Sequence, residues 1–594
     1  MFSTKFCPQG YTIENVREIF HKEGYEYNPS EDDLTMVNDH LNSIETVMIE
    51  SQRDFQDKIS RPLKFRFNKS QFVKIYRILL RSGRIQKRPD IEKWMKMKAA
   101  RGHSGVNVVT LMTAGSQFGA DENGYQTEQI IKRGGCPENC DFCPFAVDEN
   151  NIPIQPKSYL PDEPANMRAT QNFFHPLGQM FDRIHCLDEI GHINENAKLE
   201  IIISGGTFNF YPKPYIIWFV RCMYYAANCY FEYRDTEEFS REMGTLEEEQ
   251  SINESATLRI IGLTVETRPD YLIEEKGDRY DIVRYFRYLG ITRVQIGIQH
   301  TDDNILRFVS RNCTNDENKI GIKFLKDNGF KVDIHLMLDL PSSTPQKDID
   351  MLTEVLSNPD YEADQWKIYP TEVTPFTKIK DLYEKGIYKP YDDQYLFELI
   401  KEFKMKIKPY YRINRIIRDI SGHYIIAGYS QQFTNLRQIL NEDMRINNWN
   451  CKCIRCREIK GNKINEEDVK LSIIKYKGSD ANEYFISYET VKYLIGFLRL
   501  RLNINYSSLI IPELINSALI RELHIYSNIT NVGNNLNHSM QHKGYGKRLI
   551  AIAEEIAKKK GFTKMAIIAG TGVRSYYKKL GYELEDSYMC KELE

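Results

Sequence analysis

Residues 258–268 read LRIIGLTVETR, in which an apolar, β-branched run ends on a glutamate, a threonine and an arginine. Similar short runs recur between residues 105 and 370, and longer stretches of helical character separate them. They are VNVVTLM (106–112), LEIIIS (199–204), TRVQIGI (292–298), KVDIHLML (331–338) and DQWKIY (364–369). Short strands that alternate with helices are typical of βαβ units. The sequence therefore predicts an α/β fold with a parallel sheet, either open or closed as a barrel.

Polar residues follow three of these runs directly. Gly205-Gly206-Thr207 come after the run that ends at residue 204, and Glu266-Thr267-Arg268 follow the run quoted first. Gln299-His300 occupy the same place after the run that ends at residue 298. Because the carboxyl ends of parallel strands meet at one face, and barrel enzymes bind substrate there, we expect these residues to lie at an active site.

Length and composition set the outer limits. The 594 residues weigh 69.7 kDa, which at roughly 150 residues per domain indicates about four domains. Hydrophobic residues make up 41% of the chain, so neither a disordered protein nor a small disulfide-stapled one is expected. The 80 basic and 82 acidic residues nearly cancel, and net charge therefore gives no indication of a nucleic-acid partner. Without a bilayer-length apolar run or a secretory signal, we expect a cytoplasmic protein with no membrane contact.

Three cysteines lie close together at Cys136, Cys140 and Cys143. Such clustering indicates metal ligation in a reducing compartment rather than a disulfide framework. Zinc usually takes four ligands, and no fourth candidate lies nearby in the sequence. Three thiolates on one loop instead suit a [4Fe–4S] cluster in which one iron keeps a position open for a substrate or cofactor. Three ordinary buried cysteines are the weaker alternative.

The spacing of these cysteines after one predicted strand, with Gly-Gly after the next, resembles the radical S-adenosylmethionine superfamily. The resemblance implies a partial (β/α) barrel whose cluster chelates S-adenosylmethionine through its open iron. One electron then cleaves the sulfonium and yields a 5′-deoxyadenosyl radical. On the S-adenosylmethionine side of the barrel we expect Gly205, Gly206, Glu266, Gln299 and His300.

Beyond about residue 465 the pattern changes to the strands LSIIKY, YLIGFLRLRL and ALIRELHIY, followed by a glycine turn and the helix HKGYGKRLIAIAEEIAKKK. Backbone N–H groups at such a helix start favour a pyrophosphate, although most G-x-G turns only cap a helix. The preceding strand RELHIY, and Tyr576-Tyr577 after the next strand, make the layout resemble GNAT acetyltransferases. The sequence thus predicts a separate α+β domain that binds acetyl-CoA.

A second cysteine group, Cys451, Cys453 and Cys456, offers three thiolates within six residues. Structural zinc is the interpretation we favour, with a fourth ligand from elsewhere in the chain; a loop with free thiols is the alternative. The group falls between the predicted barrel and the GNAT-like domain. A zinc ion there could brace their junction.

Two segments carry clustered positive charge. Between Lys58 and Arg88 there are eleven Lys or Arg and no Asp or Glu, with aromatic residues at Phe65, Phe67, Phe72 and Tyr76. A solvated helix face and a nucleic-acid surface are both open interpretations of this segment.

The second basic segment, residues 399–418, has seven basic residues against one acidic residue. Arg412, Arg415 and Arg418 are spaced three apart, so we expect them to share a helix face and to contact the phosphates of a nucleic acid. An acidic stretch, residues 235–254, is expected to be an insertion or an exposed loop.

Taken together, the motifs resemble the family of the catalytic third subunit of Elongator, the tRNA uridine carboxymethylation enzymes, over about residues 100–594. Matching stretches include EIIISGGTF, IGLTVETRPDYL, TRVQIGIQHTDDNIL and GVRSYYKKLGY. The resemblance implies that the adenosyl radical removes hydrogen from the methyl group of acetyl-CoA and that the resulting carbon radical adds to carbon 5 of the wobble uridine. Oxidation and hydrolysis of the thioester then leave 5-carboxymethyluridine. The resemblance also implies the anticodon stem-loop of tRNA as partner, with Arg412, Arg415 and Arg418 as contacts, and leaves Elongator-like accessory subunits or a homodimer open.

Lys198 and Tyr577 are the residues that this resemblance marks as catalytic. The acetyl-CoA contacts that it implies are Lys198, Glu522, Leu523, His524, Ile525, Tyr545, Gly546, Lys547 and Tyr577. Since Lys198 belongs to the barrel, it would join both domains around one ligand. The chain departs from the family pattern at Phe145-Ala146, where Gly-Gly is usual, and at Pro341-Ser342-Ser343, where Pro-Gly-Ser is usual. Residues 116–127 look like an insertion.

The predicted organisation has four parts. They are a helical, basic, tRNA-binding region (1–100), the radical-SAM core (101–400), a basic helix with the cysteine-rich linker (401–464) and the GNAT-like domain (465–594). Two rival functions are a protein lysine acetyltransferase that uses the GNAT domain alone and a non-catalytic tRNA-binding scaffold. The first needs no cysteine trio, and the second should have lost the trio or the pyrophosphate turn, so the presence of both motifs counts against the two rivals.

Overall fold

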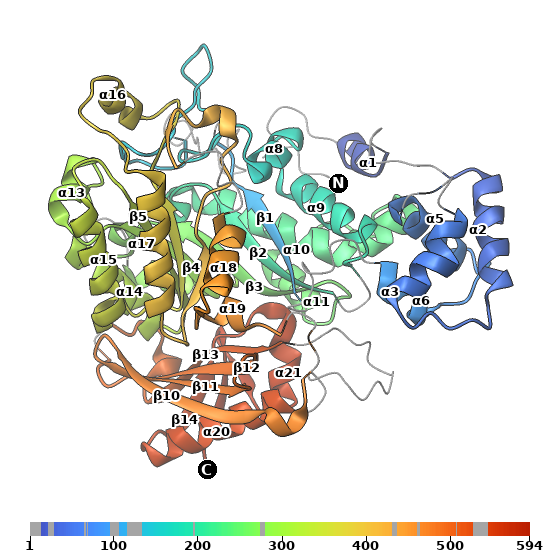
Figure 1. Cartoon of the computed structure of the whole chain (residues 1–594). Coiled ribbons are helices and arrows are strands. Elements are labelled where there is room, and N and C mark those ends of the chain that lie inside the picture. The colour runs from blue at the N-terminus through green and yellow to red at the C-terminus, as the bar shows by residue number, and fades with distance from the viewer. Residues whose placement is uncertain are drawn as a thin grey trace.

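Figure 1 shows a central sheet flanked by helices, with a group of N-terminal helices (blue) to its right and the C-terminal domain (orange to red) below it. The computed structural model describes residues 13–21, 29–63, 67, 69–95, 106–115, 134–193, 197–273, 279–429, 436–459, 462, 464–506, 508–526 and 544–594. Within these ranges no helix combines the length and the apolar character that crossing a bilayer requires. The expected insertion at 116–127 lies outside the described residues.

Seven parallel strands form the central sheet, side by side in chain order. They are β1 (Asn107–Met112), β2 (Lys198–Ser204), β3 (Arg259–Thr267), β4 (Arg293–Gln299), β5 (Lys331–Leu338), β6 (Gln365–Pro370) and β8 (Arg412–Arg415). In the described part of the chain β1 and β8 do not pair with each other, so the sheet is a partial barrel. The predicted fold class is therefore confirmed.

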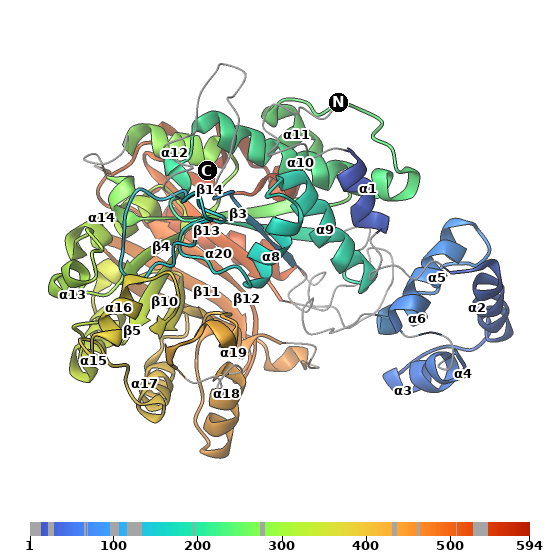
Figure 2. The same ribbon diagram turned by 90° about the horizontal axis from the view of Figure 1, so that it is seen from above.

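The two faces of each strand differ in chemistry because successive side chains alternate. In β2, Leu199, Ile201 and Ile203 are at most 1% exposed and belong to the main hydrophobic core. The other face of this strand carries Lys198 and Glu200, which are half-buried. Helices cover the apolar face, as Figure 2 shows from above. These helices are α9 (Pro176–Glu189), α10 (Lys213–Thr236), α12 (Arg279–Tyr288), α14 (Asn315–Asp327), α15 (Pro345–Ser357) and α17 (Asp393–Lys406).

The expected helix through Arg412, Arg415 and Arg418 is wrong. Helix α17 ends at Lys406, and the chain then forms β8, which pairs parallel with β6. The local periodicity of charge suggested a helix, but Tyr411 and Ile413 are buried in the barrel core, which favours an extended edge strand. The barrel sheet thus continues beyond residue 400, where we had placed the start of a linker.

The acidic stretch 235–254 is also more ordered than expected. It includes the helix α11 (Leu246–Asn253), which begins with a capping box between Thr245 and Glu248. Glu249 is fully buried and accepts two hydrogen bonds from Arg241, one of them 2.7 Å long. Charge composition alone favoured an exposed loop, whereas the acidic side chains cap and brace a helix packed on α10.

The N-terminal region is helical, as predicted. Its elements are α1 (Ile13–His21), α2 (Glu31–Ser43), α3 (Gln52–Phe55), the π-helix η2 (Gln56–Ser60), α4 (Arg61–Leu63), α5 (Lys69–Arg81) and α6 (Pro89–Met95). The aromatic side chains of the basic segment that the structure describes, Phe67, Phe72 and Tyr76, are 1–6% exposed and form the core of this region. They are therefore packing residues rather than stacking platforms, while Phe65 lies outside the described residues.

The arginines of the same segment make ion pairs. Arg77 contacts Asp188 of α9 at 2.7 Å, and Arg81 contacts Asp235 at 3.4 Å. Arg84 reaches Glu31 at 2.5 Å and Arg88 reaches Asp90 at 2.8 Å. Part of this positive charge is thus used to attach the helical region to the barrel.

The C-terminal domain contains a second seven-stranded sheet, in the order β10-β11-β12-β13-β14-β16-β15. Its elements are β10 (Lys470–Gly478), β11 (Ala481–Glu489), β12 (Leu494–Leu502), β13 (Ser517–Ile525), α20 (Tyr545–Lys559), β14 (Lys564–Ile567), α21 (Arg574–Lys578), β15 (Glu583–Glu585) and β16 (Tyr588–Glu592). Strands β13 and β14 pair only over Ser517–Ile520, and the pairing of β12 with β13 shifts between Arg499 and Leu500. Strands β13 and β14 therefore diverge beyond the point where the β12–β13 pairing shifts.

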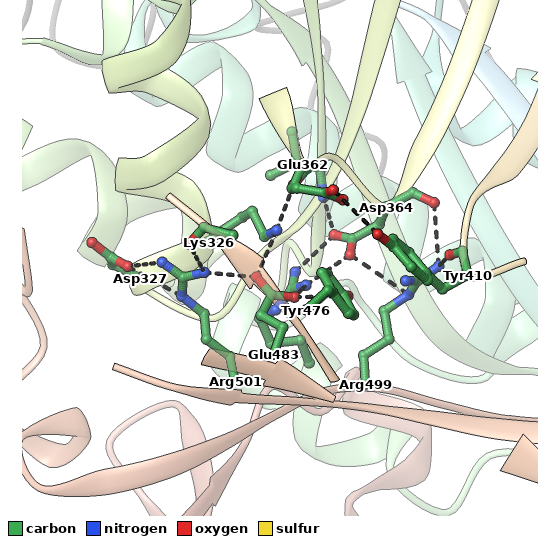
Figure 3. Close-up of polar contacts among 12 residues, drawn as sticks. Lys326, Asp327, Glu362, Asp364, Tyr410, Tyr476, Glu483, Arg499 and Arg501 are labelled. Atoms are coloured by element: carbon green, nitrogen blue, oxygen red, sulfur yellow. Dashed lines mark hydrogen bonds and ion pairs between the residues drawn. The ribbon is translucent and has the colours of Figure 1, made fainter. Parts of the chain in front are cut away.

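Buried ion pairs join this domain to the barrel (Figure 3). Arg521 forms two 2.7 Å contacts with Asp364, which directly precedes β6, and one 2.8 Å contact with Glu483 of β11. Arg501 contacts Glu483 at 2.6 Å and also pairs with Asp327 at the end of α14. All five side chains are at most 1% exposed, so the charges compensate one another away from water.

The domain sits against the amino ends of the barrel strands. Arg521 donates a hydrogen bond to the carbonyl of Phe330, which precedes β5, and Tyr526 receives one from Arg412, the first residue of β8. The polar residues predicted to form the active site lie at the carboxyl ends. Seven residues of β2 separate the two ends, and at about 3.3 Å per residue they span about 20 Å.

Candidate active site

The first cysteine group lies on a loop over the carboxyl ends of the barrel strands. Cys136, Cys140 and Cys143 line one cavity together with Gly206, Glu266 and Gln299, which come from three different strand ends. The hydroxyl of Thr207 donates to Cys136 Sγ at 3.1 Å. The structure therefore brings together all three cysteines and part of the residues predicted for the S-adenosylmethionine side.

Gly205 and Gly206 have positive φ values of 145° and 82°. A Cβ atom at Gly205 would lie 1.7 Å from Thr113 Oγ1, and one at Gly206 would lie 3.0 Å from the carbonyl of Gly135. Only glycine allows β2 to turn this close beneath the cysteine loop. Gly205 itself does not line the cavity, so its role is to shape the turn.

Two arginines that the sequence did not single out as ligands reach the buried cysteine. Arg268 Nη1 lies 3.3 Å from Cys140 Sγ, and Arg311 Nη1 lies 3.7 Å from it. The hydrogen bond from Cys143, together with the guanidinium groups of Arg311 and Arg268, lowers the pKa of Cys140 well below its ordinary value. A thiolate is the form that binds iron, so the donors and their charge environment fit an iron–sulfur cluster.

Polar side chains continue from this cavity into the barrel. Tyr159 donates to Glu266, Lys367 lies 3.8 Å from the same carboxylate, and Lys367 also donates to Gln295. His335, next to Lys367 in the sheet, lines the cavity, and its Nε2 is buried without a hydrogen-bond partner among the described residues. Burial lowers the pKa of His335 well below its ordinary value, so the imidazole is neutral.

His300 does not face the cavity, contrary to expectation. Its ring accepts a hydrogen bond from the Asp302 N–H at 2.9 Å, and its Nε2 lies 3.3 Å from Asp348 of α15. Gln299 takes a left-handed backbone conformation, with φ of 65°, and this turn directs the chain away from the cavity directly after it. In this structure His300 thus stabilises the strand-to-helix connection, and its contact with the cofactor stays a prediction.

The predicted coenzyme A turn is described from Gly544 onward. Gly544 has φ of 78° and precedes α20, so the first N–H groups of this helix have no partner inside the helix. Tyr545 is buried against Tyr488, with 4.8 Å between ring centroids. A Cβ atom at Gly546 would lie 2.8 Å from the Tyr576 hydroxyl, so this glycine keeps the helix start open. The arrangement fits a pyrophosphate.

Strand β13 carries the residues that are predicted to bind the acyl end of acetyl-CoA. Glu522 receives a 2.9 Å hydrogen bond from Arg499, and although burial opposes it, Lys331, Arg499 and Arg293 lower the pKa of this carboxyl. Burial lowers the pKa of His524 to about 4, and its Nε2 has no hydrogen-bond partner among the described residues. Leu523 and Ile525 alternate with these two residues along β13 and pack against the hydrophobic core of the C-terminal domain, which includes residues of α20.

Tyr577 is 7% exposed and packs in the core of the C-terminal domain beside Tyr582. Burial raises its pKa, so its hydroxyl stays protonated. Lys198 is the first residue of β2 and pairs in register with Arg259, against which Gly572 packs. It thus lies at the barrel floor near the C-terminal domain, but none of its contacts reaches the predicted acetyl-CoA residues.

Cys451, Cys453 and Cys456 meet at the junction of β8 and the C-terminal domain. Their sulfur atoms all lie within 4.8 Å of one another, and no other His, Cys, Asp or Glu joins this group among the described residues. The backbone N–H of Ile454 donates to Tyr411 of the barrel. The geometry fits three ligands of a metal ion and gives no fourth.

The three arginines predicted to contact tRNA have different surroundings. Arg412 pairs with Glu458, and Arg418 pairs with Glu163 at 2.6 Å. Arg415 is the most exposed, with 47% of its side chain accessible, and it contacts the exposed Asp419 at 2.9 Å. Arg415 and Arg418 share the neighbours Tyr159 and Tyr369, whereas Arg412 lies beside Tyr526 and Glu458, so the three side chains do not form one group.

Residues 130–352 match the radical SAM superfamily and residues 363–445 match the radical SAM C-terminal domain. Residues 456–582 match the acetyltransferase (GNAT) family. The second match supports the correction above, because it carries the barrel region past residue 400. Fold and site together define a radical S-adenosylmethionine enzyme joined to a GNAT domain.

The chain is 36% identical over 511 residues to the tRNA uridine(34) acetyltransferase of Methanocaldococcus jannaschii, covering 84% of this chain and 87% of that protein. It is 33% identical over 507 residues to Elongator complex protein 3 of Dictyostelium discoideum, covering 84% of each. The solved structure of Methanocaldococcus infernus Elp3 without residues 1–46 matches 82% of this chain and 100% of that one, with 31% identity and a TM-score of 0.65. The chain belongs to the Elongator complex protein 3 family.

Proposed function

We propose that this protein modifies the wobble uridine of tRNA by adding a carboxymethyl group, taken from acetyl-CoA, to carbon 5 of the base. One observation carries the proposal: the cysteine loop lies at the carboxyl ends of the barrel strands, and the C-terminal domain, which carries the predicted acetyl-CoA residues, packs against their amino ends. Buried ion pairs hold the two ends in a fixed relation. A protein that used either half alone would not need this connection.

Cys136, Cys140 and Cys143 would hold the [4Fe–4S] cluster, and Gly206 would let S-adenosylmethionine approach it. When bound, these groups supply a radical that abstracts hydrogen from the acetyl methyl group. Arg268 and Arg311 favour the thiolate form of Cys140, and Thr207 orients Cys136. Thiolate ligands and a cluster of this kind require a reducing compartment, which supports a cytoplasmic location.

The C-terminal domain would mainly hold acetyl-CoA. The open N–H groups at the start of α20 would bind the pyrophosphate, where Tyr545, Gly546 and Lys547 lie. The diverging edge of β13, from Glu522 to Ile525, would bind the pantetheine arm and present the acetyl group to the barrel. In this proposal Lys198 and Tyr577 act on the thioester, as the family resemblance implies.

The base of the uridine would enter the barrel from the cysteine side. A base inside a stacked anticodon loop cannot reach a recessed site, so it would be splayed out. Gln295 and the neutral His335 line the cavity and would offer hydrogen-bonding groups to the edge of a uracil ring, while Lys367 donates to Gln295 and orients it. They would orient carbon 5 toward the radical source.

Contacts with the rest of the anticodon stem-loop are assigned to positive charge near the barrel mouth. Arg415 is the favoured member of the predicted trio, because Arg412 and Arg418 are paired with carboxylates. The basic segment 58–88 would add phosphate contacts through the lysines and arginines that are not ion-paired. Elongator-like accessory subunits or a homodimer remain proposals that belong to the family.

The second cysteine group would bind a structural zinc ion. Its sulfur geometry supports this, and Arg437, which lies close to all three cysteines, would offset the negative charge of three thiolates. Such a site would fix β8 relative to the C-terminal domain. Metal analysis of Cys453→Ser against the parent protein tests it, and equal zinc content would argue for free thiols.

The rival function, lysine acetylation by the GNAT domain alone, is less well supported. Glu522, one of the predicted acetyl-CoA residues, is under the influence of Lys331 and Arg293 of the barrel, so in this proposal the barrel would restrict the access of a protein substrate. A non-catalytic tRNA-binding scaffold would have no use for an intact cysteine trio with a lowered pKa at Cys140.

The test is anaerobic reconstitution with iron and sulfide, followed by incubation with tRNA, S-adenosylmethionine, reductant and acetyl-CoA. We expect 5-carboxymethyluridine in the hydrolysed tRNA, and neither cluster nor product with Cys140→Ala. Cys222→Ala, which changes a buried cysteine outside the loop, is the matched control and should keep both. Product formed by the Cys140→Ala protein, or lysine acetylation without tRNA, would overturn the proposal.

A further inference from the structure

Lys331 is a lysine of the barrel floor that makes no side-chain bond in the described part of the chain, although the carboxylates of Glu522 and Glu200 favour its charge. Its neighbours are paired: Arg293 with Glu200 across the floor, Arg499 with Glu522, and Lys326 with Glu483 at 2.6 Å. Lys331 makes no side-chain hydrogen bond or ion pair with any residue in the described part of the chain. A half-buried ammonium without an acceptor is costly unless something else supplies one.

Its place in the fold indicates what that acceptor is. Lys331 is the first residue of β5 and pairs in register with Arg293 of β4, on the interior face of the barrel. This is the end of the barrel against which the C-terminal domain packs. The bulge in β13 turns Glu522 toward the same place, and the charge of Lys331 is the largest electrostatic influence on that carboxyl.

The carboxylates around Lys331 are already satisfied. Glu200 pairs with Arg293, and Glu522 pairs with Arg499. What the floor lacks is therefore an additional acceptor oxygen, and the nearby His524 Nε2 is likewise unpartnered in the described structure. Lys198 likewise makes no side-chain bond among the described residues, but it stands on β2, three strands along the sheet from β5.

We propose that Lys331 binds the carbonyl oxygen of the acyl group that β13 presents, and so positions the acetyl group at the entrance to the barrel. This inference rests on the proposed function and extends it to a residue of the barrel. An ammonium in a site of low dielectric forms a strong, charge-assisted hydrogen bond with a carbonyl. The bond would also draw the acetyl methyl group toward the interior rather than toward solvent.

The test compares two ligands that differ at the carbonyl. Acetyl-CoA and S-ethyl-CoA are titrated calorimetrically into the full-length, cluster-loaded protein without tRNA, and chromatography checks that acetyl-CoA stays intact. We expect the parent protein to bind acetyl-CoA about 10- to 100-fold more tightly than S-ethyl-CoA, as a charged hydrogen bond allows. Lys331→Met should abolish that preference while the affinity for S-ethyl-CoA stays the same, and Lys331→Arg should keep part of it.

Lys347→Met is the matched control, because Lys347 lies on the outer helix α15 in a partly exposed pair with Asp302. It should leave the preference intact. An equal affinity of the parent protein for both ligands would overturn the proposal without any variant, and so would a full preference in Lys331→Met. If the preference behaves as expected but no modified uridine forms, the proposed function fails while the role of Lys331 stands.

Discussion

Replacing Arg521 with methionine tests whether the buried ion pairs join the barrel to the C-terminal domain. The change removes two 2.7 Å contacts with Asp364, one 2.8 Å contact with Glu483 and one 3.0 Å bond to the Phe330 carbonyl. Breaking a buried pair by removing one partner costs about 3–5 kcal/mol. Here each carboxylate keeps another cation, Arg499 at 3.5 Å for Asp364 and Arg501 at 2.6 Å for Glu483, so we expect about 3 kcal/mol.

The cost should depend on pH in a defined direction. Arg521 and Arg499 lower the pKa of Asp364, although burial opposes them. A carboxyl whose folded pKa is lowered contributes stability above its unfolded pKa of about 4, and loses it as the pH falls through the folded value. The difference between parent and Arg521→Met should therefore be largest near pH 7 and should shrink below about pH 4.

Hydrogen exchange followed by mass spectrometry measures this loss locally. Amides of β12 and β13 should exchange about 100-fold faster in Arg521→Met at pH 7, the factor that corresponds to about 3 kcal/mol. Arg445→Met removes an exposed pair with Glu442 and should change nothing measurable. Unchanged protection in Arg521→Met would mean that apolar packing alone holds the two domains, and the reasoning from the ion pairs would be wrong.

Further predictions concern single positions. Gly206→Ala should reduce the iron content of the reconstituted protein, because the added methyl group would press on the cysteine loop. A full iron content would show that the loop does not need a glycine at this position. Ser342→Gly should raise the free energy of unfolding by up to about 1 kcal/mol, since Ser342 has φ of 74°, and a loss of stability would refute this. Arg415→Ala should weaken tRNA binding and reduce its log–log salt slope by about 0.7–0.9, whereas Arg445→Ala should leave both unchanged.

The parallel sheet and the cysteine site could be predicted because each depends on a local signal. Six of the seven barrel strands are short apolar runs. The three cysteines lie close to one another in the sequence, and the two glycines are consecutive. Strand β8 was mistaken for a helix because its arginines recur every three residues, while its pairing with β6 depends on contacts across the fold. Pattern and tertiary packing disagreed there, and packing decided the outcome.

The neighbours of the cysteines that no sequence signal announced share another property. Arg311 and His335 approach the cysteine cavity only when separate strands close into the barrel. His300 lies outside the lining of that cavity because the left-handed turn at Gln299, which no residue preference announces, sets the direction of its side chain. Strand ends identify the rim of a site, whereas the orientation of each side chain depends on the turn that follows.

The arginines on the face of the C-terminal domain that packs on the barrel make this domain depend on the barrel. Arg499, Arg501 and Arg521 find part of their counter-charge on the barrel, at Asp327 and Asp364. A fragment limited to residues 465–594 would place these arginines in water and remove the barrel carboxylates that orient them. We therefore expect the neighbouring strands, including the stretch from Glu522 to Ile525, to keep their arrangement only when the barrel is attached.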